Sequence, residues 1–150
     1  MIFINASENR DGNTAVLGRK IFAGQTYEQI NLRDFQIHQL GQEHANDDQF
    51  DQVLAKIKAA DVVVFGTPIY WSDMSGYMKT LIDRLGQSMG EPGFSNKRSA
   101  LVITGSAPSD AVAPVTHVFD HFTQRMGWHF AGSGVRDGQI RQLHDQLFGK

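Results

Sequence analysis

Two adjacent aromatic residues, Tyr70 and Trp71, are the side chains in this sequence best suited to hold a planar ligand. They follow a hydrophobic run at residues 62–65 and a Gly-Thr-Pro turn, and a segment of helical periodicity comes after them. Large flat side chains at the end of a strand can stack on an aromatic ring system. Tyr and Trp also commonly cover the end of a core, so either residue taken alone fits both interpretations.

A second chemically rich stretch is residues 5–14, which read NASENRDGNT. Ser7, Asn13 and Thr14 bring side-chain donors, and Arg10 adds a positive charge. The helix expected after this loop presents free N–H groups and the positive end of its dipole, which favour a phosphate group. The same residue types make ordinary turns and helix caps. The dinucleotide fingerprint G-x-G-x-x-G is absent.

A third loop, residues 105–110, consists mostly of small residues and reads GSAPSD. Small side chains leave room for the edge of a planar ligand and bring backbone N–H donors close to it. An ordinary turn before Pro114 explains the same residues, so this loop by itself is weak evidence.

The elements that must position these loops alternate along the chain. Apolar, β-branched runs predict strands at 1–4, 27–32, 62–66, 100–104 and 128–135, and the third and fourth are nearly continuous hydrophobics, as in strands buried on both faces. Stripes of helical period lie between them, beginning after Gly12-Asn13, near residue 50, near 74, at Pro114 and near 140. We expect Asp47 or Asp48 to cap the second helix, and Ser72 or Asp73 the third.

This alternation predicts an α/β fold: a doubly wound five-stranded parallel sheet with helices on both faces. We expect one domain over residues 1–150, since no linker or internal repeat interrupts the pattern. In a sheet of order 2-1-3-4-5, ligands bind outside the carboxyl ends of strands 1 and 3. The loop of residues 5–14 and the loop of residues 67–73 therefore meet at that crevice.

The composition of the chain excludes several kinds of partner and site. A formal charge of −2 gives no electrostatic reason to expect nucleic acid or an anionic membrane as a partner, and zero cysteines exclude disulfides, thiolate metal ligands and cysteine nucleophiles. The apolar start has no basic segment before it and no apolar stretch is long enough to span a membrane, so we expect a cytoplasmic protein. The six histidines, His44 among them, suggest no metal site; His117 and His121 lie four apart but lack a third ligand.

The combination of SENRDGNT after strand 1 and TPIYWSDMSGYMKTLIDRL after strand 3 resembles the flavodoxin-like NAD(P)H-dependent FMN reductases. The second stretch is the longer and more specific match, and the last third of the chain matches only in its strand–helix order. Two departures lie in the first loop, where Ala6 replaces a glycine and Glu8-Asn9 replace a Pro-Arg pair. Cysteines that some relatives carry after strand 2 are absent, which excludes a metal cluster there.

The resemblance implies a flavodoxin-like fold, an FMN cofactor and NAD(P)H as co-substrate. It implies that Ser7, Asn13 and Thr14 hold the FMN phosphate, with Arg10 as a further candidate. The isoalloxazine ring would be lined by Pro68, Ile69, Tyr70, Trp71, Thr104, Gly105 and Ser106. Hydride would pass from the nicotinamide to the flavin and then to a small planar acceptor: a quinone, an azo or nitroaromatic compound, or free flavin. A homodimer or homotetramer is implied as well.

Two other functions use the same architecture. A flavodoxin-type electron carrier binds FMN without oxidising NAD(P)H itself, but such carriers are strongly acidic and this chain is not. A scaffold or receiver-like domain binds no flavin. A phosphoreceiver needs an Asp at the end of strand 3, where this sequence has Gly66-Thr67-Pro68.

Overall fold

A computed structural model describes residues 1–42 and 45–149 of the chain. Its strands are β1 (Ile2–Asn5), β2 (Glu28–Asn31), β3 (Val62–Tyr70), β4 (Asp73–Met74), β5 (Arg98–Thr104) and β6 (His129–Gly134). Its α-helices are α1 (Asn13–Ile21), α2 (Phe50–Ala59), α3 (Gly76–Leu85), α4 (Val112–Arg125) and α5 (Asp137–Phe148). Short 3₁₀ turns lie at Leu32–Asp34, Gly86–Ser88 and Pro108–Asp110.

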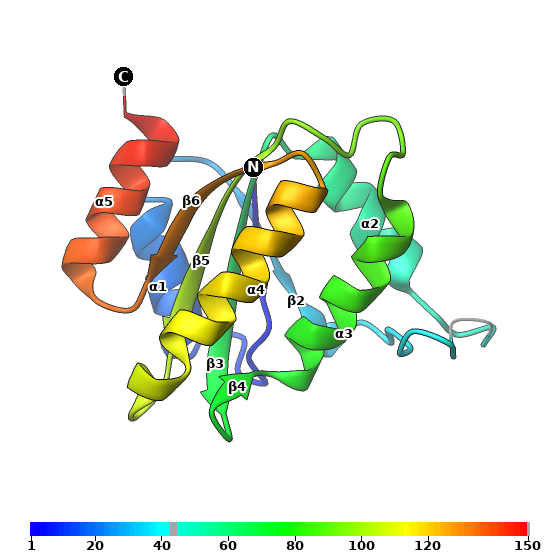
Figure 1. The fold of residues 1–150 in the computed structure, drawn as a ribbon, viewed down its shortest axis with the longest axis horizontal. Helices are drawn as coiled ribbons and strands as arrows, with labels where there is room; N and C mark the ends of the chain where they lie inside the picture. The colour runs from blue at the N-terminus through cyan, green and yellow to red at the C-terminus, as the bar shows by residue number, and fades with distance from the viewer. Residues whose placement is uncertain (43–44, 150) are drawn as a thin grey trace.

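The sheet has the predicted arrangement. Its strand order is β2-β1-β3-β5-β6 with all of these neighbours parallel, and the short β4 pairs antiparallel with the end of β3. The predicted fourth and fifth strands are β5 and β6, so the order 2-1-3-4-5 and the doubly wound fold are confirmed. The crossover helices lie in two layers, with α1 and α5 on one face and α2, α3 and α4 on the other (Figure 1).

Alternation along β3 divides the core between these two faces. Val63 and Phe65 pack with the residues of α2, α3 and α4, whereas Val62 and Val64 pack with those of α1 and α5. All four side chains are fully buried, which explains why the run is continuously hydrophobic. Trp128 stacks on Phe65 and is buried.

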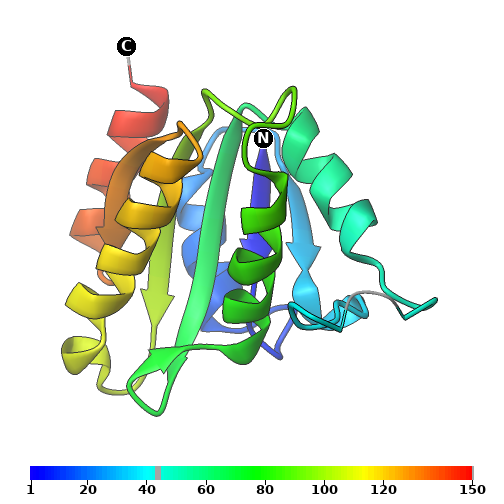
Figure 2. The same cartoon turned by 45° about the vertical axis from the view of Figure 1, so that its right-hand side comes forward.

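The strand prediction was wrong at the end of β3, which continues four residues past Gly66 to Tyr70. The ladder with β1 ends at Gly66, but β5 pairs with β3 as far as Pro68, and β4 pairs with Ile69 and Tyr70. A proline argues against a central strand, and the two-residue turn that follows lacks the Asn-Gly or Gly-Gly that marks a hairpin. What the sequence presented as a loop is therefore a β-hairpin (Figure 2).

Two predicted caps were also wrong. Ser75, rather than Ser72 or Asp73, precedes α3 and accepts a hydrogen bond from the Met78 N–H at 3.3 Å. Gln49 precedes α2, and Asp48 instead accepts the Phe50 N–H at 3.2 Å. The hairpin accounts for the first difference, because Ser72 and Asp73 are used in the turn and in β4.

Candidate functional site

The loops after β1, β3 and β5 meet at one edge of the sheet, as the strand order requires. A hydrogen bond of 2.9 Å between the hydroxyl groups of Thr14 and Thr104 links the first and third of these loops. A Cβ atom at Gly66 would lie 2.7 Å from the Thr14 methyl carbon and 2.6 Å from the Phe3 ring. Glycine at this position therefore lets the start of α1 approach the sheet closely enough for that contact.

The start of α1 offers an anion site. Gly12 precedes the helix, no described side chain caps it, and its first turn contains no acidic residue. Asn13 and Thr14 are the first two helical residues, and Thr14 is buried. Uncapped N–H groups at the positive end of a helix dipole favour a phosphate group. A cavity of about 240 Å³ opens beside them, lined by Asn13, Val16, Leu17, Thr104, Gly105 and Val135.

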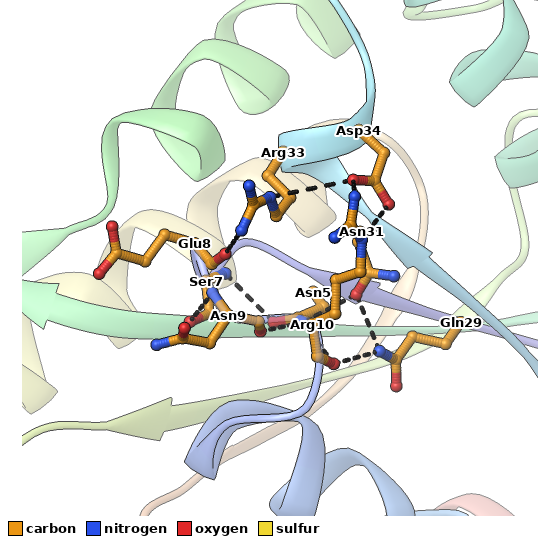
Figure 3. Close-up of polar contacts among 9 residues, drawn as sticks. All are labelled: Asn5, Ser7, Glu8, Asn9, Arg10, Gln29, Asn31, Arg33 and Asp34. Atoms are coloured by element: carbon orange, nitrogen blue, oxygen red, sulfur yellow. Dashed lines mark hydrogen bonds and ion pairs between the residues drawn. The ribbon is translucent and has the colours of Figure 1, made fainter.

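The loop before α1 is shaped by Asn5 (Figure 3). The buried Asn5 side chain accepts the Ser7 N–H at 3.1 Å and donates to the Asn9 carbonyl at 3.0 Å and to the Asn31 side chain at 2.9 Å. The Ser7 hydroxyl in turn accepts the Asn9 N–H at 3.1 Å. Internal hydrogen bonds therefore hold Ser7 in a tight turn beside the start of α1.

A second hollow, of about 180 Å³, separates the β3–β4 hairpin from residues 105–110. It shares Gly105 with the cavity at α1, and its lining is Ile69, Trp71, Ser72, Gly105, Ser106, Ala107, Pro108 and Asp110. The Ser72 hydroxyl donates to the Asp110 carboxylate and joins the two walls. A Cβ atom at Gly105 would lie 3.4 Å from both Ile69 and Pro108, so the absence of a side chain there keeps the space open.

The hairpin tip has an unusual backbone. Trp71 and Ser72 have φ angles of 50° and 62°, the left-handed conformation that a two-residue hairpin turn needs and that non-glycine residues adopt at a cost. The Trp71 side chain is fully exposed, at 101%. A large aromatic side chain held in solvent on a strained turn beside a hollow is well placed to contact a ligand.

Comparison with known proteins identifies the family. The family model described as NADPH-dependent FMN reductase matches residues 1–139. The chain belongs to this family. YwqN of Bacillus subtilis (strain 168), whose name describes a putative NAD(P)H-dependent FMN-containing oxidoreductase, is 30% identical over an alignment 163 positions long, which covers 96% of this chain and 90% of that protein.

Solved structures agree with this membership. The Trp repressor binding protein from Bacillus subtilis has a TM-score of 0.72 and 28% identity, with 99% of each chain covered. An FMN-dependent NADH-azoreductase from Bacillus anthracis, solved in complex with FMN, has a TM-score of 0.59 at 12% identity, covering 97% of this chain and 95% of that one, a likeness of fold alone. The chain is thus an FMN-dependent NAD(P)H oxidoreductase, as the sequence predicted.

The residues at the sheet edge fit an FMN cofactor. An uncapped helix start suits its phosphate, and Ile69, Trp71 and Gly105 are among the residues that line the hollow next to it. Of the residues predicted for this FMN reductase, Asn13, Ile69, Trp71, Thr104, Gly105 and Ser106 line the two cavities that share Gly105, and Thr14 contacts them through its hydrogen bond with Thr104. Pro68 is the register partner of Thr104.

Tyr70 and Arg10 lie elsewhere. Tyr70 points away from the hollow of Ile69 and Trp71, as strand alternation requires, and lines a separate cavity beside α3. Burial raises the pKa of its phenol, with a further upward contribution from Glu8, while a hydrogen bond with Ser7 opposes them. Arg10 pairs with Asp34, with its Nε 3.0 Å from the carboxylate (Figure 3). Its role toward a phosphate remains a prediction and would require that pair to open.

Sequence reasoning missed three contributors. Asn5 is a buried polar residue at the end of a hydrophobic strand. A polar residue at that position in the sequence could have indicated its role. Ser75 donates to the Ala6 carbonyl at 2.8 Å and so ties α3 to the end of β1. Asp110 accepts a hydrogen bond from Ser72 because the hairpin brings Ser72 close to it. No local sequence pattern predicted that pairing.

Within residues 1–42 and 45–149, no three His, Cys, Asp or Glu side chains gather as metal ligands would, and no helix is long and apolar enough to cross a bilayer. His44 lies outside the described residues.

Proposed function

We propose that this protein transfers reducing equivalents from NAD(P)H to a small planar acceptor such as a quinone, an azo or nitroaromatic compound, or free flavin. The observation that carries the proposal is the hydrogen bond between Thr14 and Thr104, which places the start of α1 beside Gly105, the residue that lines both the cavity at α1 and the hollow beside Trp71. Bound FMN supplies the redox chemistry; the protein supplies its position and surroundings.

Each wall of the proposed site has a distinct task. The first N–H groups of α1, with the Asn13 and Thr14 side chains, bind the phosphate. Ile69 and Trp71 hold the ring by apolar contact, and Gly105 and Ser106 bring backbone N–H groups to its edge. The exposed side of Trp71 leaves room for flat molecules to approach from solvent. A planar acceptor is therefore the substrate class that this open, aromatic site favours.

The decisive experiment combines a spectrum with a reduction assay. Purified protein, as isolated or after addition of FMN, is expected to show the flavin absorption bands, with FMN identified by mass after release. Anaerobic addition of NADPH or NADH is expected to bleach those bands within seconds, and a quinone is expected to restore them. Flavin that stays oxidised for minutes would instead identify an electron carrier, and failure to take up FMN would leave a scaffold.

The phosphate assignment predicts a ligand-specific loss. Replacing both Asn13 and Thr14 by alanine removes side-chain donors to a charged group, each worth about 1.5–3 kcal/mol. We expect FMN affinity to fall at least about tenfold, while affinity for riboflavin, which has no phosphate, changes little. Titration followed by flavin fluorescence measures both. Equal losses for the two ligands would place the phosphate elsewhere.

We also propose that the protein is a homodimer or homotetramer. The fully exposed Trp71 at the mouth of the ring hollow supports this proposal, since exposed aromatic residues are enriched at interfaces. Light scattering coupled to size-exclusion chromatography gives the subunit number directly, and a monomer at micromolar concentration would contradict the proposal.

A further inference from the structure

A further large cavity lies outside the proposed FMN site. Its volume is about 490 Å³, and it is enclosed by the segment that follows β2, by Tyr70 and by the start of α3. Figures 1 and 2 both show that segment beside the beginning of α3. The lining is Leu32, Arg33, Phe35, Gln36, Ile37, Gln39, Tyr70, Ser75, Gly76, Tyr77 and Thr80. None of these residues lines the two cavities assigned to FMN.

The walls of this cavity suit a flat aromatic ring. Tyr70 and Tyr77 remain 46% and 44% exposed, and Phe35 and Ile37 pack against the core from the opposite segment. Aromatic side chains stack on planar ligands, and a volume of about 300–1,000 Å³ is typical of sites for small molecules. Gln36 and Gln39 add amides that can hydrogen bond to ring nitrogens or oxygens.

The charge of this cavity favours an anion. Arg33 is the one charged residue among the described residues that line it. Its guanidinium donates to the Glu8 carbonyl and lies 3.9 Å from the Asp34 carboxylate (Figure 3). That carboxylate is already paired with Arg10. An arginine has five N–H donors in a planar fork, so Arg33 keeps donors for a phosphate or sulfonate.

The start of α3 strengthens this preference. Ser75, Gly76 and Tyr77 line the cavity, and no acidic residue lies in the first turn of the helix. The positive end of the α3 dipole therefore faces the same space as Arg33. Two negative charges lie nearby: Glu8, which interacts electrostatically with Tyr70, and Asp34, whose carboxylate is 3.9 Å from the Arg33 guanidinium and is paired with Arg10.

We propose that this cavity is a second binding site, for a planar aromatic group that carries a phosphate or sulfonate. Tyr70 separates it from the FMN site, because its side chain lines this cavity whereas its chain neighbours Ile69 and Trp71 line the hollow at Gly105. Two ligands share this chemistry: the 2′-phosphoadenosine end of NADPH, and an anionic aromatic acceptor. The role in turnover rests on the proposed function, whereas binding itself does not.

The test uses the FMN-loaded protein and two probes, 2′,5′-ADP and anthraquinone-2-sulfonate, followed by isothermal titration calorimetry. We expect Arg33→Gln to weaken binding of the recognised probe about tenfold or more, and Tyr77→Ala to weaken it several-fold. Arg19→Gln is the matched control for charge, because Arg19, on α1, is a similarly exposed arginine that is paired with Asp11. Lys79→Ala is the control for α3, because Lys79 does not line the cavity.

Each outcome is informative. Binding of 2′,5′-ADP alone identifies the nucleotide as the ligand, binding of the quinone alone identifies the acceptor, and mutual competition shows that the two share the site. Affinities unchanged in both Arg33→Gln and Tyr77→Ala would overturn the proposal, as would no binding of either probe at millimolar concentration. The flavin spectrum of the same samples reports separately on the FMN site, and it also shows whether Arg33→Gln has disturbed the loop at Glu8.

Discussion

The backbone conformation of Trp71 and Ser72 at the hairpin tip lowers stability at a position where we propose that a ligand binds. The left-handed backbone at Trp71 and Ser72 costs about 1–2 kcal/mol per non-glycine residue. The Trp71 ring recovers none of this by burial, since it is fully exposed. The tip is held instead by the β3–β4 pairing and by the hydrogen bond from Ser72 to Asp110. Strain retained in this way is typical of ligand-binding positions.

Two substitutions at one position separate strain from ligand contact. Trp71→Gly relieves the backbone, whereas Trp71→Ala keeps a Cβ atom and hence the strain, so we expect the glycine variant to be more stable by about 1 kcal/mol. Both variants lose an aromatic contact worth about 0.5–1.5 kcal/mol and should bind FMN roughly two- to tenfold more weakly. Urea unfolding and FMN titration measure the two effects. Equal stability would show that the turn is unstrained, and unchanged affinity would place Trp71 outside the flavin site.

At the scale of elements, features recorded in consecutive residues were predictable from the sequence, and contacts between distant residues were not. Periodicity located every strand of the parallel sheet and all five helices, because burial on one or two faces is recorded in consecutive residues. It also indicated which loops would meet, since parallel strands end at one edge. The sequence did not predict the hairpin, because its turn residues are atypical. It therefore also did not predict that Tyr70 lies apart from Ile69 and Trp71. Side-chain pairs such as Thr14 with Thr104 are 90 residues apart, and no local pattern encodes them.

A buried ion pair joins the end of the connection between β2 and α2 to α3. The Arg84 guanidinium lies 2.7 Å from the Asp48 carboxylate, and both side chains are at most 10% exposed. Arg84 also donates to the His38 carbonyl at 2.8 Å and lies 4.3 Å from the centre of the Phe50 ring. This cluster fixes the segment that forms one wall of the large cavity against α3.

Acid should weaken that ion pair in a defined direction. Burial acts to raise the pKa of Asp48, but hydrogen bonds from Arg84, His38 and Phe50 outweigh it and lower the pKa below its ordinary 3.8. The contribution to stability is therefore complete above pH 3.8 and is lost as the pH falls through the lower folded-state value. Asp48→Asn leaves Arg84 buried without its counter-charge, which costs about 3–5 kcal/mol.

The measurement is urea unfolding of wild type and Asp48→Asn across pH. We expect the difference in unfolding free energy to be constant from pH 7 to 5 and to shrink below pH 3.8. Asp51→Asn is the matched control, because Asp51 is an exposed carboxylate in the first turn of α2, and it should cost under about 1 kcal/mol. A difference that does not depend on pH would assign the loss to packing rather than to charge.

At the scale of the whole molecule, the proposed FMN site joins segments that are distant in the chain. Residues 7–14, 67–72 and 104–110 come from three crossover units, and they touch through Thr14, Thr104, Ser72 and Asp110. The unfolded chain cannot assemble these contacts, so FMN binds the folded state alone. A ligand of this kind stabilises the fold by about 2.7 kcal/mol at one hundred times its Kd.

We therefore expect saturating FMN to raise the thermal midpoint by roughly 5–10 °C, given about 2–4 °C per kcal/mol for a domain of this size. Riboflavin at the same concentration should raise it less, because it lacks the phosphate that the start of α1 binds. In the Asn13→Ala/Thr14→Ala variant the advantage of FMN over riboflavin should shrink, because only the backbone N–H groups of α1 remain to bind the phosphate, while the riboflavin shift persists. If FMN and riboflavin gave equal shifts in the wild-type protein, the cavity at α1 would contribute nothing to binding, and the ring hollow beside Trp71 would be the whole site.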